Sequence, residues 1–179
     1  MSFFSKMKSL WDKPSNSSLE SGSSQPQAQE AALSVPIDER RKKPRLNAVA
    51  GSKILIIDDS KTVCSMLEKM LQQNKYVTSS AYSAEEGLVK AQADRPDLIF
   101  LDIVLPEMDG FAALRAFRKN PETENIPIMM MSGNDQATEI FYASRIGADD
   151  FLKKPFSRYE LFFRIEKLLD DERRLVRKQ

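Results

Sequence analysis

Residues 53–59 read KILIIDD, a short apolar run that ends in two adjacent aspartates, Asp58 and Asp59. A second apolar run, residues 98–101, ends in a third aspartate, Asp102. Each run has the length and composition of a buried strand. In open parallel sheets, ligands bind outside the carboxyl ends of the strands. The three carboxylates are therefore the first candidates for a functional site.

After Gly51 the chain alternates short apolar runs with amphipathic segments of helix length, which is the pattern of repeated βα units. The expected strands and helices are, in turn, 53–57, 76–80, 97–101, 127–131 and 149–152, and 60–73, 84–94, 109–119, 135–146 and 157–171. This pattern predicts an α/β fold with a doubly wound, flavodoxin-like (βα)5 parallel sheet of order 2-1-3-4-5. The first and third strands are neighbours in that order, so the three aspartates should converge.

The composition fits one modest globular domain, with 179 residues, 41% of them hydrophobic, and a net charge of +1 that gives no bulk case for nucleic-acid binding. The single cysteine, Cys64, cannot form an internal disulfide, and no apolar run approaches the length of a membrane span. The sequence therefore predicts a cytoplasmic protein.

Four segments are expected along the chain. Residues 1–13 form a short basic amphipathic helix, and residues 14–51 form a flexible, largely disordered linker with a basic segment at 39–45. Residues 52–171 form the folded domain, and residues 172–179 form a charged C-terminal tail. For the first helix two alternatives stay open, docking to a membrane surface or partner protein, and a frayed tail.

Three carboxylates in one pocket repel one another unless a cation neutralises them. The chain contains no histidine, and carboxylate ligands suit a hard ion such as Mg²⁺ better than zinc. Ser132 and Lys154 follow two further strands and should face the same pocket. A hydroxyl, an ammonium group and a metal ion together cradle a phosphoryl group, with Asp102 as the nucleophile that forms an acyl phosphate.

The set Asp58-Asp59, Asp102, Ser132 and Lys154-Pro155 resembles the phosphoacceptor signature of response-regulator receiver domains, the CheY-like family, over about residues 52–170. The resemblance implies that Asp102 accepts a phosphoryl group from a sensor histidine kinase or phosphotransfer protein. It also implies no enzyme activity beyond autodephosphorylation.

The resemblance implies a role for each matching residue. Asp59 binds Mg²⁺ directly, Asp58 binds it directly or through water, and Asp102 and the main-chain carbonyl of Val104 complete the protein ligands. Lys154 and Ser132 contact the phosphoryl group. Phe151 occupies the position of the aromatic switch residue, and the Lys154-Pro155 bond is expected in cis.

The output implied by the resemblance is protein–protein contact through the face of the fourth helix, fifth strand and fifth helix, as in chemotaxis and type IV pilus twitching regulators. After residue 170 only a charged stretch remains, so we expect no direct DNA binding. Candidate residues of this face are Ile140, Phe141, Lys153, Tyr159, Phe162 and Phe163, some of which must be core.

Two other functions are weighed on the same chain. Arg41 and Arg45 match the Arg-x-x-x-Arg motif that resembles the entry of PilZ-type cyclic-di-GMP-binding domains, although the companion Asp/Asn-x-Ser-x-x-Gly motif is absent. The second alternative is an adaptor that binds partners without phosphorylation. A haloacid-dehalogenase-like phosphatase is disfavoured because Val104 replaces its second aspartate, and no nucleotide-binding Gly-x-x-x-x-Gly-Lys loop is present.

Overall fold

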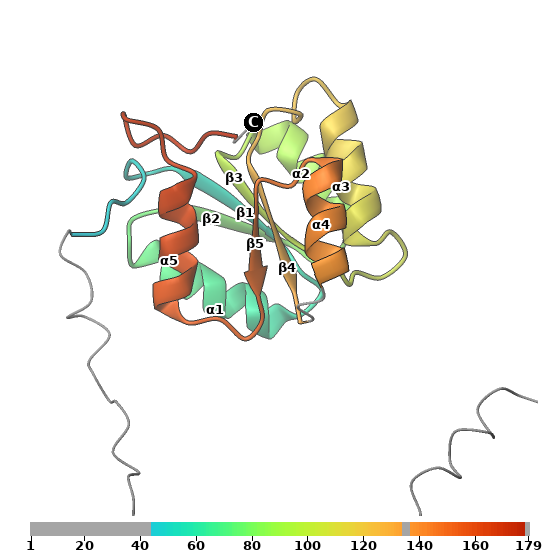
Figure 1. The fold of residues 1–179 in the computed structure, drawn as a ribbon, viewed down its shortest axis with the longest axis horizontal. Coiled ribbons are helices and arrows are strands. Elements are labelled where there is room, and N and C mark those ends of the chain that lie inside the picture. Colours follow the sequence, from blue (N-terminus) through green and yellow to red (C-terminus); the bar gives the residue numbers. More distant parts are fainter. Residues whose placement is uncertain (1–43, 134–136, 178–179) are drawn as a thin grey trace, which may run out of the picture. The chain divides into compact units, whose positions relative to one another are not determined.

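The computed structural model describes residues 44–133 and 137–177. The expected helix 1–13, most of the expected linker and Arg41 lie outside the described residues. In the described part, five strands form one parallel sheet in the order β2-β1-β3-β4-β5 (Figure 1). The predicted fold class and strand order are confirmed.

The strands and helices alternate along the chain without exception. The strands are β1 (Lys53–Ile57), β2 (Val77–Ala81), β3 (Leu98–Asp102), β4 (Ile128–Ser132) and β5 (Asp150–Lys153). The helices are α1 (Lys61–Gln72), α2 (Ala84–Asp94), α3 (Gly110–Lys119), α4 (Ala137–Ile146) and α5 (Arg158–Lys167). β1 has the predicted bounds, and each of the other four strands begins and ends one residue later than expected.

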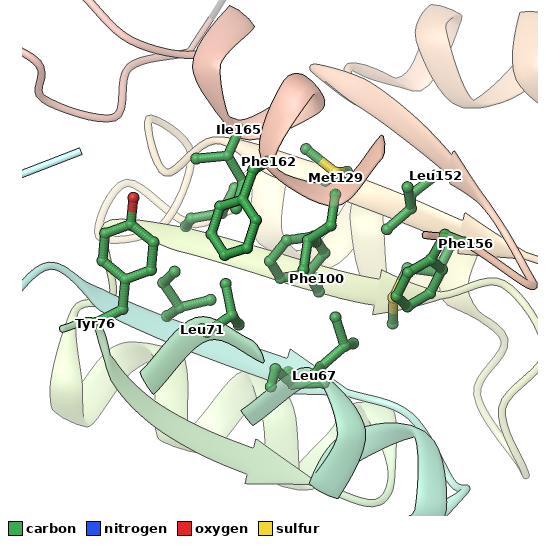
Figure 2. Close-up of a cluster of buried hydrophobic side chains, with 14 of the residues drawn as sticks. Leu67, Leu71, Tyr76, Phe100, Met129, Leu152, Phe156, Phe162 and Ile165 are labelled. Carbon is green, nitrogen blue, oxygen red and sulfur yellow. The ribbon is translucent and has the colours of Figure 1, made fainter. Parts of the chain in front are cut away.

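Helices cover both faces of the sheet, with α1 and α5 on one side and α2, α3 and α4 on the other (Figure 1). Side chains of the central strands alternate between the two resulting cores, so that Ile54 and Ile56 face α1 and α5 while Leu55 and Ile57 face α2 and α3. Figure 2 shows the first core, in which Phe100 and neighbouring residues pack beneath α5. Burial on both faces explains why these strands read as continuous apolar runs.

Polar caps start the helices immediately behind the carboxyl edge of the sheet. The side chains of Ser60, Ser83, Asp109 and Ser157 each accept a hydrogen bond from the backbone N–H three residues later, at 3.4, 3.2, 2.7 and 3.1 Å. Such caps satisfy amide groups that the first helical turn leaves unpaired. Among the described residues, no helix has both the length and the apolar character needed to cross a bilayer.

The fifth helix is shorter than the expected 157–171. It ends at Lys167, and the chain then reverses so that Leu169 and Leu175 pair in an antiparallel bridge. Both leucines are partly buried against the first core. The sequence predicted a charged C-terminal tail from residue 172. As far as Arg177 this segment is folded onto the domain, because Leu175 packs against the first core and backbone groups of the segment are hydrogen-bonded there.

The expected linker also ends earlier than residue 51. Ala48 is 7% exposed, and its N–H donates a hydrogen bond to the Tyr76 hydroxyl at 2.9 Å. The N–H of Val49 donates to the carbonyl of Arg173 at 3.2 Å. Residues 44–51 therefore pack against the domain, which the low-complexity composition before them did not indicate.

Candidate functional site

The predicted site residues lie at one edge of the sheet, at the carboxyl ends of four strands. Asp58 and Asp59 follow β1, and Asp102 is the last residue of β3. Ser132 is the last residue of β4, and Lys154 follows β5. The strand order reverses between β1 and β3, which is the point where open α/β sheets bind their ligands.

The three aspartates converge, as the strand order predicts. One carboxylate oxygen from each of Asp58, Asp59 and Asp102 lies within 4.8 Å of the other two. Asp58 is fully buried and Asp102 is 5% exposed, whereas Asp59 is exposed. The Oδ1 atom of Asp58 accepts a hydrogen bond from the Ser60 N–H at 3.0 Å, which fixes this side chain at the floor of the site.

Lys154 reaches across from the far edge of the site and joins two of the carboxylates. Its Nζ atom lies 2.5 Å from Asp58 Oδ2 and 2.9 Å from Asp102 Oδ2. The Lys154-Pro155 peptide bond is cis, as the resemblance implied. One ammonium group against three carboxylates leaves a net negative site, and this charge together with an oxygen-only ligand set fits a hard divalent cation.

Burial and charge shift the pKa values of the central pair. Burial raises the pKa of Asp102, and the neighbouring Asp58 raises it further, against the opposing effects of Lys154 and the Val104 backbone N–H. Burial lowers the pKa of Lys154, but its hydrogen bonds to Asp58 and Asp102 outweigh that effect and raise it. Lys154 therefore stays charged at neutral pH, and a cation that enters the site would favour the ionised form of Asp102.

The two predicted switch residues are buried beside this cluster. Ser132 is 2% exposed, and its carbonyl accepts a hydrogen bond from the Lys154 N–H at 2.7 Å. Phe151 is 8% exposed and belongs to the second core, on the α2, α3 and α4 side of the sheet. Phe151 therefore points inward in this structure.

Gly110 contributes to the site in a way that the sequence did not reveal. A Cβ atom built on Gly110 would lie 2.0 Å from the main-chain oxygen of Asp102, and the Gly110 N–H donates to the carbonyl of Ile103 at 2.9 Å. The start of α3 thus packs directly on the backbone of Asp102. Val104, two residues beyond Asp102, has a 72% exposed side chain at the rim of this loop. The sequence signal for Gly110 was only that of a turn glycine.

Cys64 also contacts the backbone of a site residue, Asp58. It is buried on α1, and its Sγ atom donates a hydrogen bond to the carbonyl of Asp58 at 3.3 Å. Apolar residues at helical spacing around Cys64 indicate burial, but periodicity does not show which backbone group the thiol contacts.

Arg45, a candidate residue for binding cyclic-di-GMP, packs its side chain against α5. Its guanidinium carbon is 4.8 Å from the centre of the Tyr159 ring and 5.9 Å from that of Phe162. The N–H of the next residue, Leu46, lies 3.4 Å from Glu166 Oε1. The guanidinium group that the motif offers for stacking on a guanine base is therefore stacked on α5 here.

The fold and the site define a receiver domain. Residues 54–166 match the family described as the response regulator receiver domain, and the chain belongs to this family. The described domain is thus the receiver domain of a two-component response regulator.

Similar proteins are found among both small and large regulators. The chain is 35% identical to protein PilH of Pseudomonas aeruginosa over 118 residues, which cover 66% of this chain and 98% of PilH. It is 34% identical to the alkaline phosphatase synthesis transcriptional regulatory protein PhoP of Bacillus subtilis, but over 49% of that protein. The chain therefore spans about half the length of the latter relative.

A similar solved structure is that of the chemotaxis protein CheY4 of Vibrio cholerae. The two chains share 31% identity with a TM-score of 0.64, over 67% of this chain and 100% of CheY4.

Proposed function

We propose that this domain is a phosphoacceptor in which an oxygen of Asp102 takes a phosphoryl group from a phosphohistidine. The observation that supports this best is the position of the Asp102 carboxylate, 2.9 Å from Lys154 Nζ and within the acidic cluster at the switch point of the sheet. The carboxylate attacks phosphorus, the P–N bond breaks, and its electron pair returns to the imidazole of the donor. The chain has no histidine, so the donor belongs to a sensor kinase or a phosphotransfer protein.

Mg²⁺ is the cofactor that the donor set fits. Asp59, Asp58 and Asp102 would hold it with the main-chain carbonyl of Val104, since carboxylate and carbonyl oxygens are ligands for a hard ion. The ion would supply charge neutralisation for the entering phosphoryl group. Lys154 then remains to contact a further phosphoryl oxygen, and the buried Asp58 orients Lys154 through their 2.5 Å contact.

Phosphorylation would act by shifting the domain between two arrangements. The Ser132 hydroxyl would move toward the phosphoryl group and bind it. This movement of Ser132 would alter the packing of Phe151 beneath α4. The response appears on the α4–β5–α5 face, where five of the six residues expected there are exposed: Ile140, Phe141, Lys153, Tyr159 and Phe163. The sixth, Phe162, is 1% exposed and belongs to the core.

The proposed output is therefore contact with a protein partner. The domain accepts one phosphoryl group and later loses it by hydrolysis, and it turns over no other substrate. Almost the whole of PilH and of the chemotaxis protein CheY4 is matched by this one domain. That coverage supports a regulator of motility or chemotaxis that works as a receiver without binding DNA directly.

Intact-mass analysis after incubation with acetyl phosphate and Mg²⁺ tests the proposal. The wild type should gain one phosphoryl group, and Asp102→Asn or wild type in EDTA should gain none. Asp171→Asn, at an exposed carboxylate outside the site, is the matched control and should behave as the wild type. A phosphoryl group retained by Asp102→Asn would reject Asp102 as the acceptor.

A further inference from the structure

Residues Leu169–Arg177, here called the terminal clasp, connect parts of the domain that lie far apart in sequence. Leu169 and Leu175 pair with each other and pack against the core under α5. The N–H of Val176 donates to the carbonyl of Leu168 at 2.9 Å, which holds the reversed chain against the end of α5. The terminal clasp is thus anchored on one side of the sheet.

Arg177 extends the terminal clasp toward elements on the other side. Its Nη1 atom donates to the carbonyl of Glu124, in the loop between α3 and β4, at 3.1 Å. Its Nε atom lies 3.6 Å from Asp149 Oδ1, in the residue that precedes β5. Arg177 therefore contacts both loops that lead into the last two strands.

Asp149 is already neutralised by another arginine. Its side chain is 1% exposed, and its Oδ2 atom lies 2.8 Å from Arg118 Nη2 and accepts the Ile128 N–H at 2.8 Å. Arg118 also donates to the carbonyls of Gly147, Glu124 and Ile126, at 2.8, 3.0 and 2.8 Å. Burial lowers the pKa of Arg118 to about 10, and the proximity of Arg177 contributes to this shift.

Arg177 is consequently a second cation on a carboxylate whose charge is already balanced. Its side chain is 34% exposed, and its Nε atom is buried with no hydrogen-bond partner among the described residues. A partly exposed ion pair of this kind contributes little to global stability, typically less than about 1 kcal/mol. Breaking the contact between Arg177 and Asp149 therefore costs little free energy, whereas breaking the contacts of Arg118 costs more.

Both arginines press on the turn between α4 and β5. Gly147 has φ +108°, and a Cβ atom built there would lie 2.9 Å from Arg177 Nη2 and 3.3 Å from Arg118 Nε. A groove of about 210 Å³ runs from this turn along α4 and is lined by Asp149 and Phe151. Movement of the turn would thus change the space available to Phe151.

We propose that Arg177 is a positioning residue, which holds the α4–β5 turn through Asp149 and Gly147 in the arrangement of the unphosphorylated domain. This inference rests on the proposed function and adds a specific control over it. An arrangement of α4 that moves the turn must break the Arg177 contacts. The terminal clasp therefore opposes the population shift that phosphorylation drives.

Arg177→Gln removes the cation, and Arg173→Gln, at an exposed arginine of the same segment, is the matched control. Hydrogen exchange in the unphosphorylated full chain follows the amides of Gly147 and Ala148, which both donate to the carbonyl of Ala143. We expect exchange about three- to fivefold faster in Arg177→Gln, the factor for loss of one modest contact, and unchanged in the control.

With acetyl phosphate and Mg²⁺, Arg177→Gln should also reach a higher phosphorylated fraction than the wild type and the Arg173→Gln control. Unchanged exchange at the turn, or equally accelerated exchange in β1 and β3, would overturn the positioning role. A locally faster turn with an unaltered phosphorylated fraction would overturn the coupling. If the wild type itself takes up no phosphoryl group, the proposed function fails, and the coupling to phosphorylation fails with it. The exchange measurement still decides in that case whether Arg177 holds the turn.

Discussion

At the scale of single residues, Asp102 occupies an electrostatically unfavourable position in the absence of metal. Burial raises its pKa despite the contact with Lys154. A carboxyl group whose pKa is higher in the folded state than in the unfolded chain stabilises the fold below the unfolded pKa, and this contribution is lost as pH rises through the folded pKa. The ionised Asp102 therefore destabilises the metal-free domain at neutral pH.

Asp102→Asn should accordingly raise the melting temperature at pH 7 in EDTA. The gain should shrink as the pH falls and should vanish below about pH 4, where the wild-type carboxyl group is protonated in both the folded and the unfolded state. Calorimetry over this pH range measures the difference, with Asp171→Asn as the exposed control. A lower melting temperature for Asp102→Asn at pH 7 would contradict the raised pKa.

At the scale of elements, the contact between the start of α3 and the end of β3 requires glycine. Gly110→Ala would place a Cβ atom 2.0 Å from the Asp102 carbonyl, so α3 or the β3 backbone must move. We expect a loss of about 1–3 kcal/mol, the usual range for overpacking, together with slower phosphoryl uptake.

Gly133→Ala is the matched control for that substitution, because no atom of the described residues lies within 4 Å of a Cβ atom built on Gly133. Urea unfolding should show a change for this variant of less than about 0.5 kcal/mol. Equal stability of the two variants would mean that the approach of α3 to Asp102 is not restrictive.

The elements differ in how far their sequence predicted them. The KILII run is a strong local signal, so the sequence predicts the bounds of β1 to the residue, and the strand order predicts that Asp58 and Asp102 lie close together. The ends of α5 and of the linker depend on contacts distant in sequence. Leu175 packs on a core built by other segments, and Ala48 meets Tyr76, so no local pattern indicates either packing.

At the scale of the whole molecule, two neighbouring residues of α5 have different roles, one in the stability of the fold and the other in the binding of a partner. Phe162 is 1% exposed within the first core, and Phe163 is 37% exposed on the face proposed for partners. Phe162→Ala should lower the free energy of unfolding by about 3–5 kcal/mol, the range for a deleted core aromatic side chain. Urea unfolding measures this loss.

Phe163→Ala should leave stability within about 0.5 kcal/mol of the wild type, as is usual for surface substitutions. It should reduce the amount of partner protein retained by the immobilised, phosphorylated domain. Undiminished retention, measured beside phosphorylated wild type, would place the partner surface elsewhere.

The buried thiol beneath the acidic site has a practical consequence for following these changes in solution. Cys64 is the single cysteine of the chain, it is 1% exposed, and burial raises its pKa. Thiol-reactive dyes act on exposed thiolates, so the folded protein offers them an almost blank background. One cysteine introduced on the outer surface of α4 can therefore be labelled alone. In the wild type, the slow rate at which Cys64 itself is labelled measures how often α1 opens away from β1.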